Sequence, residues 1–397
     1  MIPTDEIKKQ IDAYKDEIIG FRRHLHMHPE TGFDTQDTEA FIKEFLLTEG
    51  IDILDSPIGV IAKVPAGENK QPGYIALRAD IDALPLEEEN DVSYKSQVTG
   101  KMHACGHDGH TSMLMGAAHV LNKNKKALPR DVLLIFQPAE EGPRLGGARI
   151  ILKYLESIGL AKNICAIAAL HLTTEYPCGS IAIGYGSMMA STDEFDITIT
   201  GIGGHVGSPH KAIDALSISA KFITEMESFM SRRMDPFDPA VFAIGTLQAG
   251  TARNIIPEKA FITGNLRCQR EETRNFVLSN AENLLKALCD YSGSVYVMDI
   301  CRGLPVLVND DNKTQQMQGF AEEVVGSANI FFLPHSNMGA EDFAYFSEKI
   351  PAVFTWIGAG NKEKGFTNFL HNPRFNFDEN ALMIGTTLLC KAACEMK

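Results

Sequence analysis

The sequence predicts a larger α/β domain, with a mixed sheet flanked by helices, that is interrupted by a smaller α+β domain. Three observations support this prediction. The chain has 397 residues, which favours two or three domains over a single core. Through the first half, short apolar runs alternate with segments of helical periodicity, as in an α/β sheet. Near residue 190 the pattern changes to strands that alternate in polarity, as half-exposed strands do.

The first part of the chain is expected to open with one amphipathic helix over the first 26 residues, MIPTDEIKKQIDAYKDEIIGFRRHLH. After this helix we expect buried strands at residues 74–78, 132–137 and 166–171. Helical periodicity covers residues 111–121 and 148–158. The polar segments that could carry chemistry follow the strand ends, where open α/β sheets usually place their sites.

The smaller domain is expected over residues 190–302. Its predicted elements are strand 194–200, helix 212–232, strands 241–248 and 259–267, helix 271–288 and strand 294–300. This β-α-β-β-α-β order is that of a ferredoxin-like unit. The α/β pattern resumes after residue 303 and ends in a helix over residues 379–396. The larger domain therefore comprises residues 1–189 and 303–397.

The composition is that of a globular protein with an acidic balance. Hydrophobic residues make up 44% of the chain and charged residues 22%, and the formal net charge is -14. This charge disfavours nucleic acid or an anionic membrane as the partner. The first residues lack the apolar core of a signal peptide and no run approaches 18 apolar residues, so we expect a cytoplasmic protein. The eight cysteines include no CxxC pair, and most are expected to be buried small hydrophobic residues.

Residues 103–110, His-Ala-Cys-Gly-His-Asp-Gly-His, form the most informative stretch of the chain. In an extended segment, His103, Cys105 and His107 would project from one face. A thiolate flanked by imidazoles can begin a transition-metal site, which then needs further ligands from elsewhere in the chain. The alternative is a cysteine nucleophile paired with His107, a role that would compete with metal binding.

Two adjacent carboxylates, Glu140 and Glu141, follow the strand predicted at residues 132–137. Adjacent acids on a turn can point in different directions, so one can bind a metal while the other faces a metal-activated water. Metal-assisted hydrolysis needs this pair of roles, because the metal lowers the pKa of the water and a base within hydrogen-bond reach takes its proton. The alternative is a solvated acidic turn.

Two further histidines could complete such a site. His171 directly follows the apolar run at residues 164–170, and His371 lies in a loop before the last helix. Alternatively, His171 is a satisfied core residue and His371 is simply exposed. Taken together, the candidate ligands are enough for two metals that share one ligand; they are Cys105, His107, Glu141, His171 and His371.

Asp80 and Asp82 share one face of the strand-like segment LRADIDALP at residues 77–85. Buried acids near imidazoles commonly orient metal-bound histidines. These two acids could therefore support the candidate ligands. The alternative is a salt-bridge cluster with Arg78 at the end of a strand.

The smaller domain carries polar residues of its own. His205 follows two glycines, which permit close backbone approach to a ligand, and a histidine can stabilise an oxyanion. Asn254 lies in a loop, and Arg267 ends the next predicted strand. A guanidinium and an amide suit a carboxylate. Taken singly, each of the three is also explained as a structural residue.

These segments, in this order, resemble the M20 metallopeptidase family, and most closely its amidohydrolase branch of N-acyl-amino-acid, hippurate and auxin-conjugate hydrolases. The resemblance runs from RRHLHMHPETGF at residues 22–33 to HNPRFNFDENAL at residues 371–382, nearly the whole chain. HACGHDGH, QPAEEG and RADIDALP are highly specific in combination. One departure is Cys268-Gln269 after Arg267, where small hydroxylic residues are usual.

The resemblance implies a role for each candidate. The five candidate ligands match the family's dinuclear metal site, with Cys105 in the bridging position. Glu140 matches the general base, which also shuttles a proton. Asp80 matches an acid that contacts the metal ligands rather than the metal. The matched substrate contacts of the inserted domain are His205, Asn254 and Arg267. In the family, the histidine that His205 matches often reaches the active site of the partner subunit.

The implied activity is metal-dependent hydrolysis of the amide bond in N-acyl amino acids, with two divalent ions per subunit that could be manganese, zinc, nickel or cobalt. The inserted domain is implied to act as a lid and to form a homodimer. One alternative is an M20 dipeptidase or carboxypeptidase. Another is a metal-binding protein without catalysis, which would have no need of Glu140. A serine hydrolase is disfavoured because the chain has no GxSxG motif.

Overall fold

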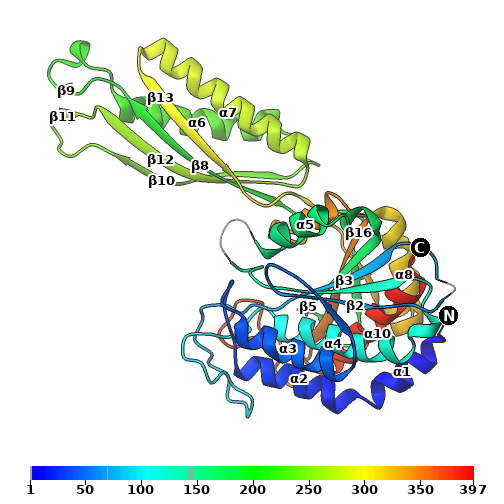
Figure 1. Ribbon diagram of the computed structural model, residues 1–397. Coiled ribbons are helices and arrows are strands. Elements are labelled where there is room, and N and C mark those ends of the chain that lie inside the picture. Colours follow the sequence, from blue (N-terminus) through cyan, green and yellow to red (C-terminus); the bar gives the residue numbers. More distant parts are fainter. Residues whose placement is uncertain (1, 69, 143–145) are drawn as a thin grey trace. The chain divides into compact units, whose positions relative to one another are not determined.

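The computed structural model describes residues 2–68, 70–142 and 146–397. The chain forms two compact units, which can be followed in Figure 1. The first unit comprises Met1–Gly186, Val308–His335 and Asp342–Lys397. The second unit comprises Ser187–Leu307 and Ser336–Glu341.

An eight-stranded mixed sheet forms the centre of the first unit, which confirms the predicted α/β architecture. Its strands lie in the order β1-β2-β4-β3-β5-β16-β6-β15. β3 runs parallel to β4 and β5, and β16 runs parallel to β5, so the carboxyl ends of these four strands lie at the same edge. The strand bounds are β1 Asp52–Leu54, β2 Val60–Val64, β3 Tyr74–Asp80, β4 Asp131–Gln137, β5 Ile164–Pro177, β6 Ile181–Ile183, β15 Ile330–Phe332 and β16 Ala352–Gly360.

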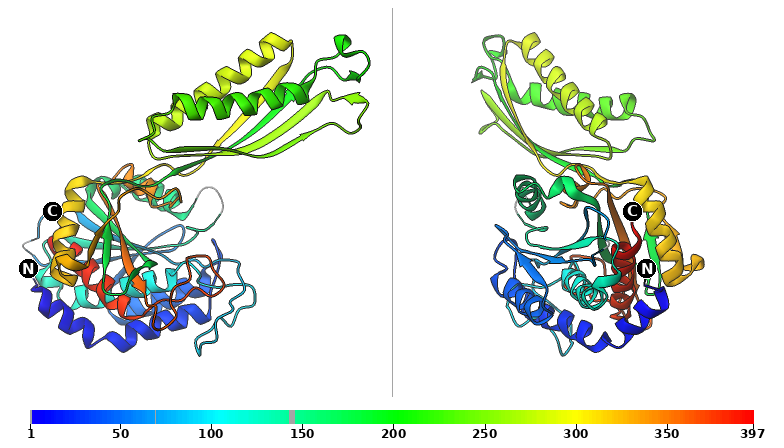
Figure 2. Two further views of the ribbon diagram at one scale, coloured as in Figure 1. Left: turned by 180° about the vertical axis from the view of Figure 1, so that it is seen from behind. Right: turned by 45° about the vertical axis from the view of Figure 1, so that its right-hand side comes forward.

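Helices cover both faces of this sheet, as Figures 1 and 2 show. α4 and α10 pack together against one face, and α5 lies on the other. Every residue of α4 from His107 to Leu121 is buried, because the sheet, α2 and α10 enclose the helix. The helix bounds are α1 Thr4–Asp12, α2 Lys15–Met27, α3 Gln36–Thr48, α4 His107–Lys123, α5 Gly147–Ser157, α8 Asp311–Val325, α9 Ala344–Ser347 and α10 Asn380–Glu395.

The single helix predicted for the N-terminal segment is wrong. The chain forms two helices there, α1 and α2, which are separated at Ala13 and Tyr14. The ring of Tyr14 stacks on the ring of His119 from α4, with 3.7 Å between the ring centroids. The break therefore accompanies a contact with a residue far along the chain, which local periodicity does not reveal.

The segment at residues 103–107 is not extended, so the prediction that His103, Cys105 and His107 share one face of a strand is also wrong. Residues 104–106 form a turn, and α4 begins at His107. Gly106 ends this turn with a φ of 86°, a left-handed conformation that glycine adopts without strain. The turn places Cys105 just before the helix and His107 in its first turn.

The second unit packs two helices against one face of a four-stranded antiparallel sheet, whose strand order is β10-β12-β8-β13. Phe195, Ile197 and Ile262 belong to its buried core beneath these helices. A two-stranded ribbon of β9 and β11 lies outside the sheet. The bounds are β8 Ser191–Thr200, β9 Gly204–His205, α6 Ala215–Arg233, β10 Ala240–Ala249, β11 Ile255–Ile256, β12 Lys259–Cys268, α7 Glu271–Ser292 and β13 Val295–Arg302.

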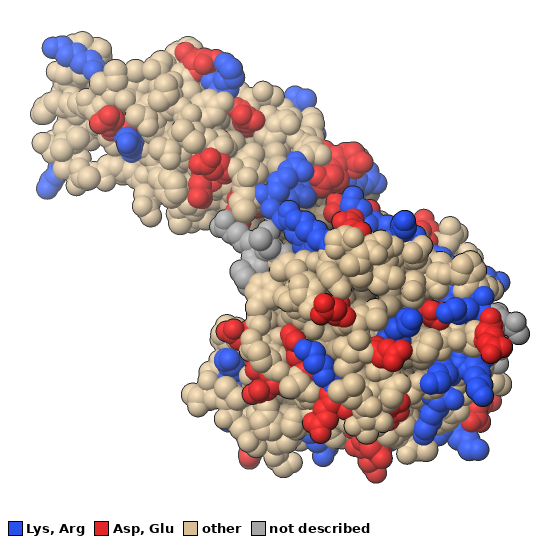
Figure 3. Space-filling model, viewed as in Figure 1, with Lys and Arg blue, Asp and Glu red and all other residues tan. Residues whose placement is uncertain are grey.

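Two short strands lie where the chain passes between the units, β7 at Gly186–Met189 and β14 at Leu307–Asn309. None of the helices in the described part of the chain is long and apolar enough to cross a membrane. On the face of the first unit that Figure 3 shows, Lys and Arg side chains are interspersed with Asp and Glu.

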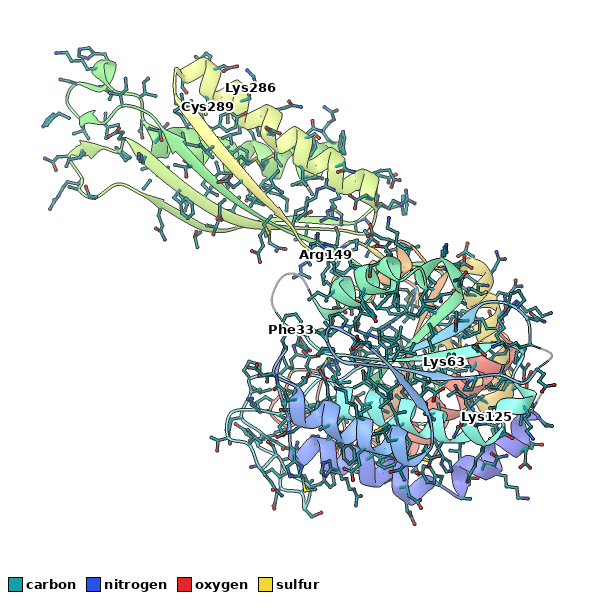
Figure 4. The ribbon with its side chains drawn as sticks, viewed as in Figure 1. Phe33, Lys63, Lys125, Arg149, Lys286 and Cys289 are labelled. Carbon is teal, nitrogen blue, oxygen red and sulfur yellow. The ribbon has the colours of Figure 1, made fainter. Side chains whose placement is uncertain are left out.

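The eight cysteines all lie in the described part of the chain and are free. Five of them are buried, which agrees with the prediction that most act as small hydrophobic residues. Cys289 is an example: it lies on α7 of the second unit, within the core of that unit (Figure 4). Cys105 differs from Cys289 in its surroundings, which are polar and charged.

Candidate metal centre

The candidate ligands gather at the carboxyl edge of the sheet in the first unit. Glu140 and Glu141 lie in the loop that follows β4, and Asp80 ends the neighbouring strand β3. His171 lies within β5, opposite Trp356 of β16. Because β3, β4, β5 and β16 are parallel, their carboxyl ends bring these side chains together.

Cys105, His107 and His171 form one group whose potential ligand atoms lie within 4.8 Å of one another, and all three residues are buried. The closest approach joins Cys105 Sγ and His171 Nε2 at 3.5 Å. Nδ1 of His107 lies 2.8 Å from the Asp82 carbonyl oxygen, and Nδ1 of His171 lies 2.8 Å from the Leu172 carbonyl oxygen. A carbonyl oxygen only accepts hydrogen bonds, so in the neutral form of each ring the proton lies on Nδ1 and Nε2 presents its lone pair. This is how metal-binding histidines are usually oriented.

Cys105, Glu141 and His371 form a second group within the same 4.8 Å limit. Nε2 of His371 lies 2.8 Å from Glu141 Oε1, within ion-pair distance. The backbone N–H of His371 donates to the Ala104 carbonyl at 2.8 Å, which anchors this loop beside the Cys105 turn. Cys105 is therefore common to both groups.

Two atoms of these groups are buried without a hydrogen-bond partner among the described residues, namely His107 Nε2 and Glu141 Oε1. Each atom has a charged neighbour, since Glu141 Oε1 lies 2.8 Å from His371 Nε2 and His107 Nε2 lies 3.8 Å from Asp80 Oδ2. A buried polar atom that lacks a hydrogen bond is nevertheless costly. A divalent cation accepts the lone pairs of imidazole and carboxylate and would satisfy both. These residues therefore fit a metal site.

The negative charges around Cys105 and His107 also favour the binding of a cation. Burial raises the pKa of the Cys105 thiol, and the carboxylates of Glu141 and Glu140 raise it further. Burial alone would lower the pKa of His107, but Asp80, Asp82 and Glu141 outweigh burial and raise that pKa to about 10. A cation among these groups takes the place of the thiol and imidazolium protons, because metal ligands bind in their deprotonated forms.

Glu140 lies next to the candidate ligands. Its carboxylate belongs to a group with His107 and Glu141 whose ligand atoms lie within 4.8 Å of one another. Glu140 Oε2 lies 4.0 Å from His107 Nε2. Its side chain is 10% exposed, against 0% for His107. The two adjacent acids therefore both face the site, as the sequence predicted for a pair that divides the roles of ligand and base.

Asp80 is hydrogen-bonded to His110, and it also lies near one candidate ligand, with Oδ2 3.8 Å from His107 Nε2. His110 Nδ1 lies 2.6 Å from Asp80 Oδ1, and His110 Nε2 accepts the backbone N–H of Leu172 at 2.9 Å. Asp80, His107 and His110 also cluster within 4.8 Å, but both ring nitrogens of His110 are already used in hydrogen bonds. His110 therefore supports the backbone beside His171 instead of binding metal.

Arg78 supports Asp80 from the other side. Its guanidinium donates to Asp80 Oδ2 at 2.8 Å, to Gln137 Oε1 at 2.9 Å and to Asp342 Oδ1 at 2.9 Å. All of these groups are buried, so the charges compensate one another within the fold. Arg78 and Asp80 thus form the salt-bridge cluster that the sequence left open as an alternative. This cluster contacts the candidate site through Asp80.

The two non-glycine residues with positive φ in the described part of the chain both flank the site. Ala139, which precedes Glu140, has a φ of 59°, and His371 has a φ of 64°. Such conformations are unfavourable for residues with a Cβ atom and cluster at functional sites. Alanine carries no preference for this region, so no sequence signal marks position 139, whereas histidine is among the residues enriched there.

In the second unit, His205 and Asn254 are neighbours although they are distant in sequence. The ribbon pairs His205 with Ile255, the residue after Asn254, and the backbone N–H of Val206 donates to the Asn254 carbonyl at 3.3 Å. His205 Nδ1 accepts the backbone N–H of Gly207 at 3.0 Å. In the neutral ring the proton therefore lies on Nε2, which leaves an exposed donor.

Arg267 lies at the other end of the sheet in the second unit. In the register of β12 and β8, Lys259 pairs with Thr200 and Arg267 pairs with Thr192. The ribbon with His205 and Asn254 lies just beyond the Lys259 end. Arg267 comes eight positions after Lys259 along the extended strand, a span of about 26 Å. Arg267 also donates to the Met338 carbonyl at 3.1 Å.

Comparisons with known proteins cover nearly all of the chain. The model of peptidase family M20/M25/M40 matches residues 76–395. N-acetylcysteine deacetylase from Bacillus subtilis is 36% identical over 384 residues, with 96% of this chain and 97% of that protein covered. Thermostable carboxypeptidase 2 from Saccharolobus solfataricus is 34% identical over 386 residues, with 96% of each chain covered. The crystal structure of the YXEP protein from Bacillus subtilis, described as a dinuclear metal binding peptidase from the M20 family, has a TM-score of 0.82 at 32% identity and covers 96% of this chain and 98% of its own.

These matches identify the chain as a metal-dependent hydrolase. The clustered thiol, imidazole and carboxylate groups already indicated this class of enzyme. The chain belongs to peptidase family M20/M25/M40. The resemblance drawn from the motifs of the sequence is thereby confirmed. Asp82 was expected to support the ligands, as was His110 of HACGHDGH, but the sequence did not indicate which groups either side chain contacts.

Proposed function

We propose that the chain is an amidohydrolase that cleaves the amide bond of N-acyl amino acids. The observation that carries this proposal is the pair of ligand groups that share Cys105, with Glu140 beside them. One ion would be held by Cys105, His107 and His171, and the other by Cys105, Glu141 and His371. The names of the deacetylase and carboxypeptidase relatives support hydrolysis of a small amide.

In the proposed mechanism, Glu140 acts as the general base and then as the general acid. When bound, the pair of divalent ions lowers the pKa of water to about 7 and polarises the amide carbonyl. Glu140 takes a proton from the attacking water and passes it to the leaving nitrogen. The Nε2 proton of His205 stabilises the negative charge that develops on the carbonyl oxygen. Asn254 or Arg267 binds the carboxylate of the amino acid.

We further propose that the second unit is a ferredoxin-like lid through which the chain forms a homodimer. An N-acyl amino acid has the length of a dipeptide, roughly 7 Å. His205 and Arg267 of one chain are too far apart to contact one such substrate, so the two residues would serve different active sites. The edge strand β13 exposes Val295 and Val297, which are 65% and 57% exposed and offer an apolar surface to a second copy.

The expected result of a mixing experiment follows from this separation. Glu140→Gln and His205→Ala proteins, each inactive alone, are co-refolded. If His205 acts on the partner's site, one of the two sites in each mixed dimer is complete, so about a quarter of the wild-type activity returns with random pairing. Mixing Glu140→Gln with Arg267→Ala provides the control, and this mixture should stay inactive because Arg267 then belongs to the chain's own site. Recovery in both mixtures, or in neither, would contradict the division of roles.

Substrate preference separates the proposal from its alternative within the family, a dipeptidase or carboxypeptidase, which the name of one relative supports. We expect kcat/KM for N-acetyl, N-benzoyl or N-indolylacetyl amino acids to exceed that for dipeptides with a free amino group. The measurement is a panel of these substrates after chelation and reloading with manganese, zinc, cobalt or nickel. A preference for the dipeptides would favour the alternative. Cytoplasmic location, the metal and the domain boundaries near residues 190 and 302 stay predictions.

A further inference from the structure

We propose that Asp82 is a positioning residue that holds the Glu140–Glu141 turn in place for the ion bound by Cys105, Glu141 and His371. This inference rests on the function proposed above. The carboxylate of Asp82 accepts the backbone N–H of Glu140 on Oδ1 at 3.0 Å and the backbone N–H of Glu141 on Oδ2 at 3.1 Å. One side chain thus fixes both peptide groups that orient the base and the ligand.

The turn depends on this carboxylate because it belongs to no regular element. Residues 138–142 lie in neither a helix nor a strand, and the preceding Ala139 has a strained φ of 59°. Asp82 is fully buried, so water does not compete for its two hydrogen bonds. Charge-assisted hydrogen bonds from two successive amides to one buried carboxylate set the direction of the chain at this point.

The other ligand group depends less on the Asp82 side chain. Asp82 orients His107 chiefly through its backbone carbonyl oxygen, which lies 2.8 Å from His107 Nδ1 and which any residue at this position provides. The Asp82 carboxylate is more distant, with Oδ1 3.6 Å from the same nitrogen. His171 is oriented by the Leu172 carbonyl, and His110 ties the Leu172 amide to Asp80. Removing the carboxylate of Asp82 therefore affects the group that contains Glu141 more strongly than the group that contains His107.

Asp82→Asn tests this selectivity, because asparagine keeps the shape of the side chain while its NH2 group faces one of the two amide N–H groups. Binding of Co²⁺ alone to the chelated protein is measured by equilibrium dialysis, together with the thiolate-to-cobalt absorption band. We expect wild type to bind two ions. In Asp82→Asn one ion should bind as in wild type and keep the thiolate band, and the other should bind about 10–100-fold more weakly. With the best N-acyl substrate, kcat should fall more than KM changes.

Asp131→Asn is the matched control. Asp131 is also buried, and its carboxylate accepts the backbone N–H of Ala66 at 2.8 Å, but it lies at the opposite end of β4 from the site. This variant should lose thermal stability yet bind both ions as wild type does. If Asp82→Asn does not fold, Asp82→Ser replaces it, since a small hydroxyl leaves room for a water beside the two amides.

The possible outcomes are distinct. Retention of both ions at wild-type affinity in the Asp82 variant overturns the positioning role, and so does an equal loss of both ions. Wild-type protein that itself binds fewer than two ions overturns the dinuclear site of the proposed function, and the role of Asp82 with it. Selective loss of one ion, with the thiolate band retained, supports both.

Discussion

Replacing Glu140 with glutamine is expected to lower kcat by about 10²–10⁴-fold, because glutamine has the size of glutamate but cannot take up a proton. Metal binding should be unchanged, since Glu140 is not one of the five proposed ligands. The backbone N–H of residue 140 still donates to Asp82, so the turn keeps its position. The measurement is the hydrolysis rate of a saturating N-acyl amino acid together with the metal content of the same preparation.

Glu156→Gln is the control for this substitution, because Glu156 is an exposed residue of α5 and its replacement changes the net charge by the same amount. Its activity should match that of wild type. Near wild-type turnover in Glu140→Gln would show that another group acts as the base. Loss of metal in Glu140→Gln would instead place Glu140 among the ligands.

Replacing Cys105 with alanine should have the second large effect, the loss of both ions. Cys105 is the one residue common to the two ligand groups, so its removal leaves two ligands for each ion. Without metal, neither the attacking water nor the amide carbonyl is activated, and hydrolysis should fall to the background rate. Metal content after dialysis against a divalent ion, measured by atomic absorption, checks the first result, and an activity assay checks the second.

Cys289→Ala provides the matched control, because Cys289 is a buried cysteine in the core of the second unit (Figure 4). This variant should bind two ions and remain active, even if its thermal stability falls through loss of packing. Full occupancy of both ions in Cys105→Ala would refute the shared ligand. Loss of only one ion would mean that Cys105 belongs to a single ion.

The main elements of the fold follow from the sequence because they depend on local patterns. The buried strands β3, β4 and β5 each contain a continuous apolar run of four or more residues, and the segments that became α4 and α5 carry helical periodicity. The break between α1 and α2 could not be predicted, because it accompanies the stacking of Tyr14 on a residue in α4. The turn before His107 was also missed, since alternating histidine and cysteine fit an extended segment and a turn equally well.

The composition of the candidate site was predictable because its motifs are specific, but its internal support was not. Asp82 and His110 act through hydrogen bonds to backbone groups of Glu140, Glu141 and Leu172. Such bonds depend on which strand ends are neighbours, and a motif read along one segment does not contain that information. The separation of His205 and Arg267 likewise required the register of β12 and β8.

The central claim is that this chain hydrolyses an amide with two ions held around Cys105. The most direct test is to titrate the chelated protein with Mn²⁺ or Zn²⁺ while hydrolysis of the best N-acyl amino acid is followed. The account predicts no activity without metal and a maximum rate when two equivalents are bound per chain. Full activity in the metal-free protein, or a maximum at one equivalent, would contradict it.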